Sequence, residues 1–173
     1  MRIFIIGFKN SGKTTAGRKL AKQLNMDFID LDEYIETKTG RSIPDIFTAE
    51  GEEEFRNIEW ESLVEISKKD DIIISTGGGA PCWCDNMNLM LKKGETIYLQ
   101  LDNDTLISRL KKATADRPIV KDKDDNELRE YVSHLKQNCE HHYLRAKHIV
   151  DGKNLKMNEL AEYVRKNIQG NNQ

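Results

Sequence analysis

The sequence predicts an α/β protein of three layers, in which helices cover both faces of a doubly wound, mostly parallel sheet. Two observations predict this fold class. Short apolar runs rich in β-branched residues alternate along the chain with segments of helical periodicity. The first run, 3–6, leads into the segment GFKNSGKT at 7–14, which matches the pattern G-x-x-x-x-G-K-[ST], and a helical pattern follows it. Strand, loop and helix therefore come in the order that a phosphate-binding loop requires.

The predicted elements are short strands separated by amphipathic helices. Ala16, Leu20 and Leu24 recur at helical spacing after the loop, and Asn25 is expected to end that helix. Strands are expected at 3–6, 26–31, 71–75, 96–101 and 148–151. Further helices are expected at about 33–38, 44–48, 52–67, 85–93, 105–112, 127–147 and 157–168. In a parallel sheet of this kind, ligands bind at the carboxyl ends of the strands.

Length and composition limit the class of protein. The 173 residues suit one compact domain, 1–173, with 32% charged and 38% hydrophobic residues. Without an apolar run long enough to cross a bilayer, and without a signal-peptide pattern, we expect a cytoplasmic protein that has no membrane partner. A monomer is expected as well. A formal net charge of −2 gives no broad attraction to nucleic acid. An anionic ligand must therefore be held by a local cluster of cations.

The segment 7–14, called the phosphate loop below, has the residues needed to bind a nucleoside triphosphate. Gly7 and Gly12 permit backbone turns that aim successive N–H groups at phosphate oxygens, and the following helix directs its positive end at the same anion. Lys13 would neutralise the β- and γ-phosphates, and the Thr14 hydroxyl would ligate a magnesium ion that bridges them. The expected co-substrate is ATP and the expected cofactor is Mg2+.

Acidic residues and glycines follow the second and third predicted strands. Asp30 and Asp32 are expected at the end of the second strand, where side chains two apart on an extended segment share a face. No acid directly follows the run 72–74, so Asp30 is the best candidate for a second magnesium ligand. The glycine triplet 77–79 is costly in chain entropy, which indicates that a ligand or another backbone must approach it closely.

Taken together, these features resemble the shikimate kinase family. The residues that carry the resemblance are the phosphate loop, Asp30-Leu31-Asp32, Arg56 after an acidic run, the glycine triplet and Arg117-Pro118. The resemblance implies a P-loop fold like that of the nucleoside monophosphate kinases, with a central five-stranded parallel sheet, a substrate-binding helical segment at about 33–60 and a lid at about 113–125. It also implies transfer of the γ-phosphoryl group of ATP to the 3-hydroxyl of shikimate, on the route to chorismate and the aromatic amino acids.

The resemblance further implies roles for individual residues. Asp32 would hold the substrate hydroxyls and accept the proton of the attacking one, while Lys13 and Arg117 would spread the charge that develops on the γ-phosphoryl group. Thr14 and Asp30 would lie at the magnesium ion. The residues expected to bind ATP are Gly7, Asn10, Ser11, Gly12, Lys13, Thr14, Thr15 and Arg117. Those expected to bind the substrate are Asp32, Arg56, Gly77, Gly78 and Gly79.

One position departs from the family pattern. In that pattern an arginine four residues before a tyrosine holds the substrate carboxylate, and alignment on Tyr143 puts Cys139 there. Losing a charged hydrogen bond of about 1.5–3 kcal/mol would weaken binding by about tenfold to a hundredfold or more. Three explanations stay open: another cation reaches the carboxylate, shikimate binds weakly through Arg56 alone, or the acceptor is a different small alcohol. The residues considered as the other cation are Lys136, Arg145, His141 and His142.

Two other functions fit parts of the sequence. A related phosphate-loop kinase acting on a gluconate-type sugar acid would use the same loop and carboxylates. A nucleotide-dependent switch would instead need a base-recognition motif such as Asn-Lys-x-Asp, which the sequence lacks. A switch would also leave the paired aspartates and the glycine triplet unexplained, so the sequence favours a kinase for a small hydroxylated acid.

Overall fold

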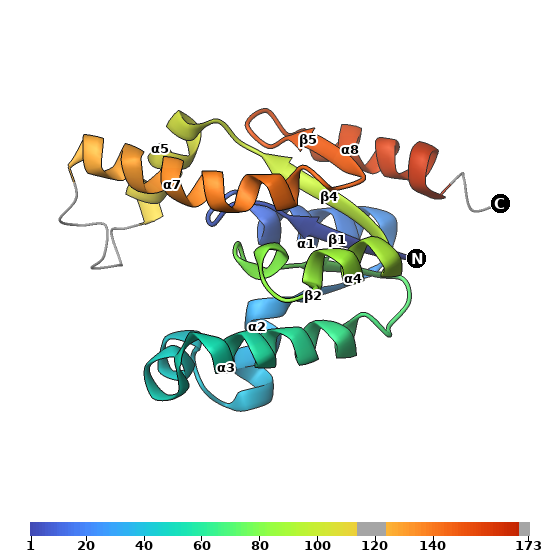
Figure 1. The fold of residues 1–173 in the computed structure, drawn as a ribbon. Coiled ribbons are helices and arrows are strands. Elements are labelled where there is room, and N and C mark those ends of the chain that lie inside the picture. Colours follow the sequence, from blue (N-terminus) through green and yellow to red (C-terminus); the bar gives the residue numbers. More distant parts are fainter. Residues whose placement is uncertain (114–123, 170–173) are drawn as a thin grey trace.

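A five-stranded parallel sheet forms the centre of the protein, in a computed structural model that describes residues 1–113 and 124–169 (Figure 1). The strands are β1 (Arg2–Ile6), β2 (Asp27–Asp30), β3 (Ile72–Ser75), β4 (Glu95–Gln100) and β5 (His148–Asp151). Their order in the sheet is β2-β3-β1-β4-β5, and all neighbours are parallel. The predicted fold class is therefore confirmed.

The strand order puts the phosphate loop at the point where the direction of winding reverses. From β1 the chain crosses first to β2 and β3 on one side, and then to β4 and β5 on the other side. The phosphate loop leaves the carboxyl end of β1, between the ends of β3 and β4. In open α/β sheets this reversal opens a crevice in which ligands bind.

Helices cover both faces of the sheet, as the sequence predicts. The helices are α1 (Lys13–Leu24), α2 (Leu31–Thr39), α3 (Ile43–Ile66), α4 (Asn86–Lys93), α5 (Asn103–Ala113), α7 (Asp125–Tyr143) and α8 (Met157–Val164), with a short 3-10 helix at Ala80–Cys82 and a π-helix at Arg165–Gln169. Ile3 and Ile5 of β1 pack in a core cluster with residues of α1 and α8. Phe4 and Ile6 point to the other face and pack with residues of α2, α3, α4 and α7.

A third core cluster packs the phosphate loop against α5 and α7. Phe8, in the loop, is 5% exposed and packs with Leu106 and Leu110 of α5 and with Leu128 and Val132 of α7. Figure 1 shows α5 and α7 side by side beyond the end of the sheet. The loop is therefore anchored by apolar contacts as well as by its link to β1 and α1.

Several element boundaries differ from those expected, and three of the differences concern α3, the start of α2 and the end of α7. The segments 44–48 and 52–67 belong to one helix, α3, with a break at Gly51 (φ 83°, ψ 177°). The second strand ends at Asp30, because the Asp30 carboxylate accepts hydrogen bonds from the backbone N–H groups of Asp32 and Glu33 and so begins α2 at Leu31. The helix expected at 127–147 ends at Tyr143, before a turn that leads into β5. Among the described residues, no helix is long and apolar enough to span a membrane.

Candidate active site

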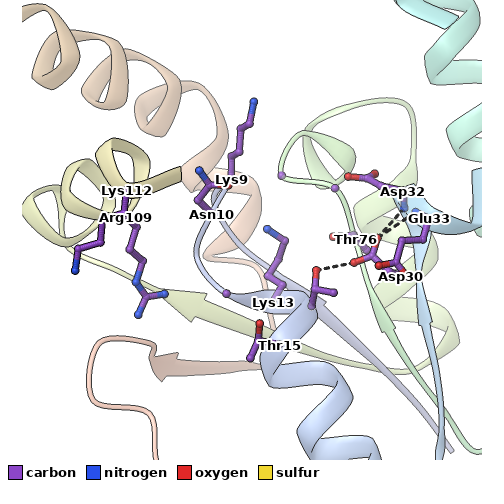
Figure 2. Close-up of a pocket in the computed structure, with 14 residues that line it drawn as sticks. Lys9, Asn10, Lys13, Thr15, Asp30, Asp32, Glu33, Thr76, Arg109 and Lys112 are labelled. Atoms are coloured by element: carbon purple, nitrogen blue, oxygen red, sulfur yellow. Dashed lines mark hydrogen bonds between the residues drawn. The ribbon is translucent and has the colours of Figure 1, made fainter. Parts of the chain in front are cut away.

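The phosphate loop borders an open cleft of about 730 Å³ (Figure 2). Its walls come from the loop and α1, from the junction of β2 and α2, from the turn after β3, and from α5. The lining residues are Lys9, Asn10, Gly12, Lys13, Thr14, Thr15, Asp30, Asp32, Glu33, Thr76, Gly77, Gly78, Arg109 and Lys112. Most of the residues expected to bind ATP therefore face one cleft. Gly7 and Ser11 lie outside its lining, and Arg117 lies outside the described residues.

The backbone of the phosphate loop turns through residues with positive φ. Gly7 has φ 145°, and a Cβ atom there would lie 2.8 Å from the Leu99 carbonyl oxygen. Gly12 has φ 94° and is the residue that caps the N-terminus of α1. Asn10 also has a positive φ of 60°. These turns leave the first residues of α1 at the cleft, so the positive end of the helix can act on an anion there.

Lys13 is buried at the base of the cleft. Its Nζ atom donates a hydrogen bond of 2.8 Å to the Phe8 carbonyl oxygen, which holds the ammonium group against the phosphate loop. Burial lowers the pKa of Lys13 to about 8, while Asp32 and Asp30 act in the opposite direction. The ammonium form therefore predominates at neutral pH, beside the place where the loop can hold phosphate.

Thr14 and Asp30 meet on the floor of the cleft. The Thr14 hydroxyl donates a hydrogen bond of 2.6 Å to Asp30 Oδ2, while Asp30 Oδ1 caps α2. A hydroxyl and a carboxylate oxygen are hard ligands that suit Mg2+, an ion that takes one or two protein groups together with phosphates and water. The described residues hold no group of three or more His, Cys, Asp or Glu residues that could bind a metal ion alone. The donor set therefore fits magnesium brought with a nucleotide.

The expected geometry of Asp32 is wrong, although its location at the cleft is as expected. Asp32 lies in the first turn of α2 rather than on an extended strand. Burial raises the pKa of its carboxyl group, the Asp30 charge adds to that rise, and Lys13 opposes it. A Cβ atom on Gly77 would lie 2.8 Å from Asp32 Oδ1. The absence of a side chain at Gly77 is therefore what leaves room for this carboxylate.

A second pocket, of about 300 Å³, adjoins the first cleft. Its lining residues are Phe8, Lys9, Asp32, Ile43, Phe47, Phe55, Arg56, Glu59, Gly77, Gly78, Gly79, Leu135, Cys139 and Tyr143. Lys9, Asp32, Gly77 and Gly78 line both cavities. A molecule in the second pocket can therefore meet a molecule in the first cleft beside the Asp32 carboxylate. We call this second cavity the acceptor pocket.

Arg56 is held rigidly in the wall of the acceptor pocket. Its Nη1 atom donates to Glu59 Oε2 at 2.9 Å and its Nη2 atom to Glu52 Oε1 at 3.1 Å. The guanidinium group also stacks on the rings of Phe55 and Trp83. Burial raises the pKa of Glu59 to about 7, although Arg56 opposes that rise. Near neutral pH, Glu59 therefore neutralises the arginine only in part, and Arg56 can still attract an anion.

Charges of opposite sign face each other across the first cleft. Figure 2 shows the cations on the phosphate loop and α5, and the acids on the β2–α2 side. The cations are Lys9, Lys13, Arg109 and Lys112, and the acids are Asp30, Asp32 and Glu33. The cationic side of the cleft suits phosphate groups, and the acidic side suits an alcohol or a metal ion.

The phosphate loop, the buried lysine and the adjoining acceptor pocket define a P-loop phosphotransferase that acts on small molecules. A family model described as "Shikimate kinase" matches residues 9–169. The chain belongs to the shikimate kinase family.

Individual relatives agree with the family match. The shikimate kinase of Azobacteroides pseudotrichonymphae is 43% identical over 162 residues, which cover 93% of this chain and 95% of the relative. The crystal structure of shikimate kinase from Bacteroides thetaiotaomicron superposes with a TM-score of 0.90 at 35% identity and covers 98% of both chains. The structure of shikimate kinase from Acinetobacter baumannii in complex with shikimate has a TM-score of 0.84 at 30% identity, covering 98% of this chain and 93% of that one. The resemblance read from the sequence is thereby confirmed, and the chain is an enzyme of the phosphotransferase class.

Cys139 lies in the wall of the acceptor pocket, near Tyr143. Interaction between the Cys139 and Cys82 thiols lowers the pKa of Cys139 and raises that of Cys82. The Tyr143 hydroxyl donates to the Gly78 carbonyl oxygen at 2.5 Å, which ties α7 to the glycine turn. None of the alternatives considered from the sequence, Lys136, Arg145, His141 and His142, is among the described residues that line this pocket.

Sequence reasoning missed two charged residues of the acceptor pocket. Lys9 occupies a variable position of the phosphate-loop pattern, where the motif carries no information about the side chain. Glu59 is one of many glutamates on α3, and only the packing of α3 on the core makes it 1% exposed. A salt-bridge spacing of three residues to Arg56 was the one signal in the sequence that could have identified Glu59.

Proposed function

We propose that this chain transfers the γ-phosphoryl group of ATP, bound with magnesium, to the 3-hydroxyl of shikimate. The observation that carries the proposal is the junction of the two cavities at Asp32, beside Lys13 and the phosphate loop. The relative from Acinetobacter baumannii, which is 30% identical, has a structure in complex with shikimate. The conserved arrangement of the fold supports the same acceptor here.

The residues of the first cleft would act mainly by position and charge. Backbone N–H groups of the phosphate loop and the positive end of α1 would hold the phosphates, and Lys13 would offset the charge that develops on the transferred group. Asp32 would orient the attacking hydroxyl and accept its proton late in the reaction, a role that the raised pKa of its carboxyl group suits. Arg117 remains a predicted contact to the phosphates from the lid.

Thr14 and Asp30 would hold the magnesium ion. Their hydroxyl and carboxylate oxygens already share one hydrogen bond, so two oxygen ligands stand within reach of a single ion. When bound, the ion would neutralise phosphate charge between the β and γ positions. Asp30 also caps α2, which would keep its carboxylate fixed as a ligand beside Thr14.

The acceptor pocket would hold shikimate between the glycine triplet and α3. Arg56, Asp32 and the backbone at Gly77–Gly79 are the proposed contacts. A gluconate-type acid is the alternative acceptor, because Cys139 stands where the family has an arginine. We propose a monomer as the active form, since both cavities are lined by residues of one chain.

Steady-state assays of ADP formation test this proposal. The purified protein, with ATP and magnesium, is given shikimate, quinate or gluconate at millimolar concentration. We expect shikimate to be phosphorylated with the highest kcat/KM. Lys13→Met should lower that value by roughly a hundredfold or more, because charge stabilisation at the transferred group is lost. Lys22→Met, a change of an exposed lysine on the same helix, is the control and should leave the rate unchanged.

Two results would contradict the proposal. A protein that ignores shikimate and phosphorylates gluconate would show that the acceptor is wrong while the reaction class is right. Full activity in Lys13→Met would show that the phosphate loop does not act on the transferred group.

A further inference from the structure

The acceptor pocket offers few positive charges to an acidic substrate. Among the described residues that line it, the cationic side chains are Lys9 and Arg56. Arg56 already donates to Glu59 and Glu52 through separate nitrogen atoms. The same pocket contains the carboxyl groups of Asp32 and Glu59. Apart from Lys9, a substrate carboxylate in the pocket would therefore meet two carboxyl groups and one arginine that is shared with other partners, so Arg56 alone is a weak anchor for it.

Helix α7 does not supply a further cation. Leu135, Cys139 and Tyr143 line the pocket from α7, at a spacing of four residues that puts them on one face of the helix. Lys136 lies beside this face, donates to the Leu101 carbonyl oxygen at 3.3 Å and pairs with Glu140 at 3.4 Å. Arg145, beyond the end of α7, donates to Asn88. These bonds engage both basic side chains outside the pocket lining.

Lys9 lies at the boundary between the two cavities. Its backbone nitrogen is 2.9 Å from the position that a Cβ atom on Gly78 would take, so the phosphate loop packs directly against the glycine turn here. In Figure 2 the Lys9 side chain extends from the loop on the side away from Thr15, whereas Lys13 lies lower in the cleft. Lys9 is exposed and is among the residues that line both cavities, so this lysine stands at the boundary that a molecule in the acceptor pocket would share with the first cleft.

We propose that Lys9 binds the carboxylate of the acceptor, in place of the cation that Cys139 does not provide. The inference rests on the proposed function, because it requires an acceptor that carries a carboxylate. Lys9 and Arg56 would hold that group from two sides, one from the phosphate loop and one from α3. Lys13, whose ammonium group is held by the Phe8 carbonyl oxygen at the base of the cleft, would keep the separate task of contacting the phosphates.

Removing the Lys9 charge should weaken acceptor binding selectively. Lys9→Met keeps the length of the side chain and deletes the ammonium group. We expect it to raise the KM and Kd for shikimate roughly tenfold to a hundredfold, the effect of losing one charged hydrogen bond, and to change the KM for ATP much less. Shikimate methyl ester has the same hydroxyl groups without the charge. Its binding should be nearly the same in wild type and in Lys9→Met.

Three further variants separate a binding role from a structural one. Lys9→Arg keeps the charge and should retain most of the shikimate affinity. Lys136→Met removes a lysine that lies outside the pocket lining and should leave shikimate binding unchanged. In the Lys9→Met background, Cys139→Arg should restore affinity for shikimate and not for the ester, because it returns a cation to the α7 wall.

Calorimetric measurement of the Kd for shikimate, its ester and ATP, together with steady-state kinetics, distinguishes the possible outcomes. If Lys9→Met binds shikimate as tightly as wild type, or weakens the acid and the ester equally, the assignment of Lys9 is wrong and Arg56 alone holds the carboxylate. An equal loss in ATP and shikimate affinity would show that Lys9 supports the phosphate loop instead, which also overturns it. A wild-type protein that neither binds nor phosphorylates shikimate contradicts the proposed function itself.

Discussion

At the scale of single residues, the cleft moves the pKa values of its two central groups toward each other. Burial lowers the pKa of Lys13 to about 8 and raises that of Asp32 above its usual range. The proposed reaction needs the first group as an ammonium and the second as a carboxylate. The active form of the free enzyme therefore exists in a window between the raised pKa of Asp32 and pH values near 8.

The pH dependence of kcat/KM for ATP should show this window. The value should rise as Asp32 loses its proton and fall with a midpoint near pH 8 as Lys13 loses its own. Asp32→Asn removes the largest influence that raises the Lys13 pKa. In that variant, the affinity for ATP, measured by calorimetry between neutral and alkaline pH, should begin to fall at a lower pH than in wild type. If the pH at which ATP affinity begins to fall is unchanged or higher in the variant, the result would contradict the coupling between Asp32 and Lys13.

At the scale of secondary structure, the glycine turn after β3 lies against both the phosphate loop and α3. A Cβ atom on Gly78 would meet Lys9 backbone atoms at 2.9 and 3.3 Å, whereas one on Gly79 would meet the tip of the Arg56 side chain at 3.0 Å. A side-chain tip can move where a packed backbone cannot. The same substitution at neighbouring glycines should therefore have different consequences.

Gly78→Ala and Gly79→Ala form a matched pair that tests this contact. Gly78→Ala should displace the phosphate loop and lower kcat/KM for ATP and for shikimate by about a hundredfold, the cost of a displacement of about 1 Å at a reacting centre. Gly79→Ala should change mainly the KM for shikimate, by a few-fold, because Arg56 moves. Thermal melting of each variant checks that it is folded. If both variants behave alike, the close packing of the loop on the turn has no part in catalysis.

The strands and the phosphate loop could be predicted because local pattern decides them. A short run of apolar β-branched residues such as 72–74 is typical of a buried strand. The phosphate-loop motif is recognised by the residue types at its fixed positions. The end of β2 could not be predicted from the run 26–31, because that run continues past the end of the strand. The boundary is set instead by the Asp30 side chain, which caps the N-terminus of α2. Lys9 and Glu59 line the acceptor pocket because of how distant segments of the chain pack together. A local sequence pattern carries no information about that packing.

At the scale of the whole molecule, a nearly neutral chain concentrates charged side chains at the carboxyl ends of its parallel strands. The formal net charge is only −2, yet the phosphate loop and α5 present lysines and an arginine to the same cleft. The sheet order places the carboxyl ends of β1, β2 and β3 side by side, and the two cavities meet there. In the proposed reaction, the fold would position two substrates with a single carboxylate, Asp32, between them.

The fate of the γ-phosphoryl group tests this arrangement most directly. ATP, magnesium and shikimate are incubated with the protein, and the products are followed by phosphorus NMR, with Lys13→Met as the control. We predict a phosphomonoester signal coupled to the proton on the carbon that bears the 3-oxygen of shikimate, appearing in step with ADP and missing in Lys13→Met. Release of inorganic phosphate with shikimate unchanged would contradict the proposed transfer, because it would show a cleft that hydrolyses ATP without delivering the phosphoryl group to the acceptor pocket.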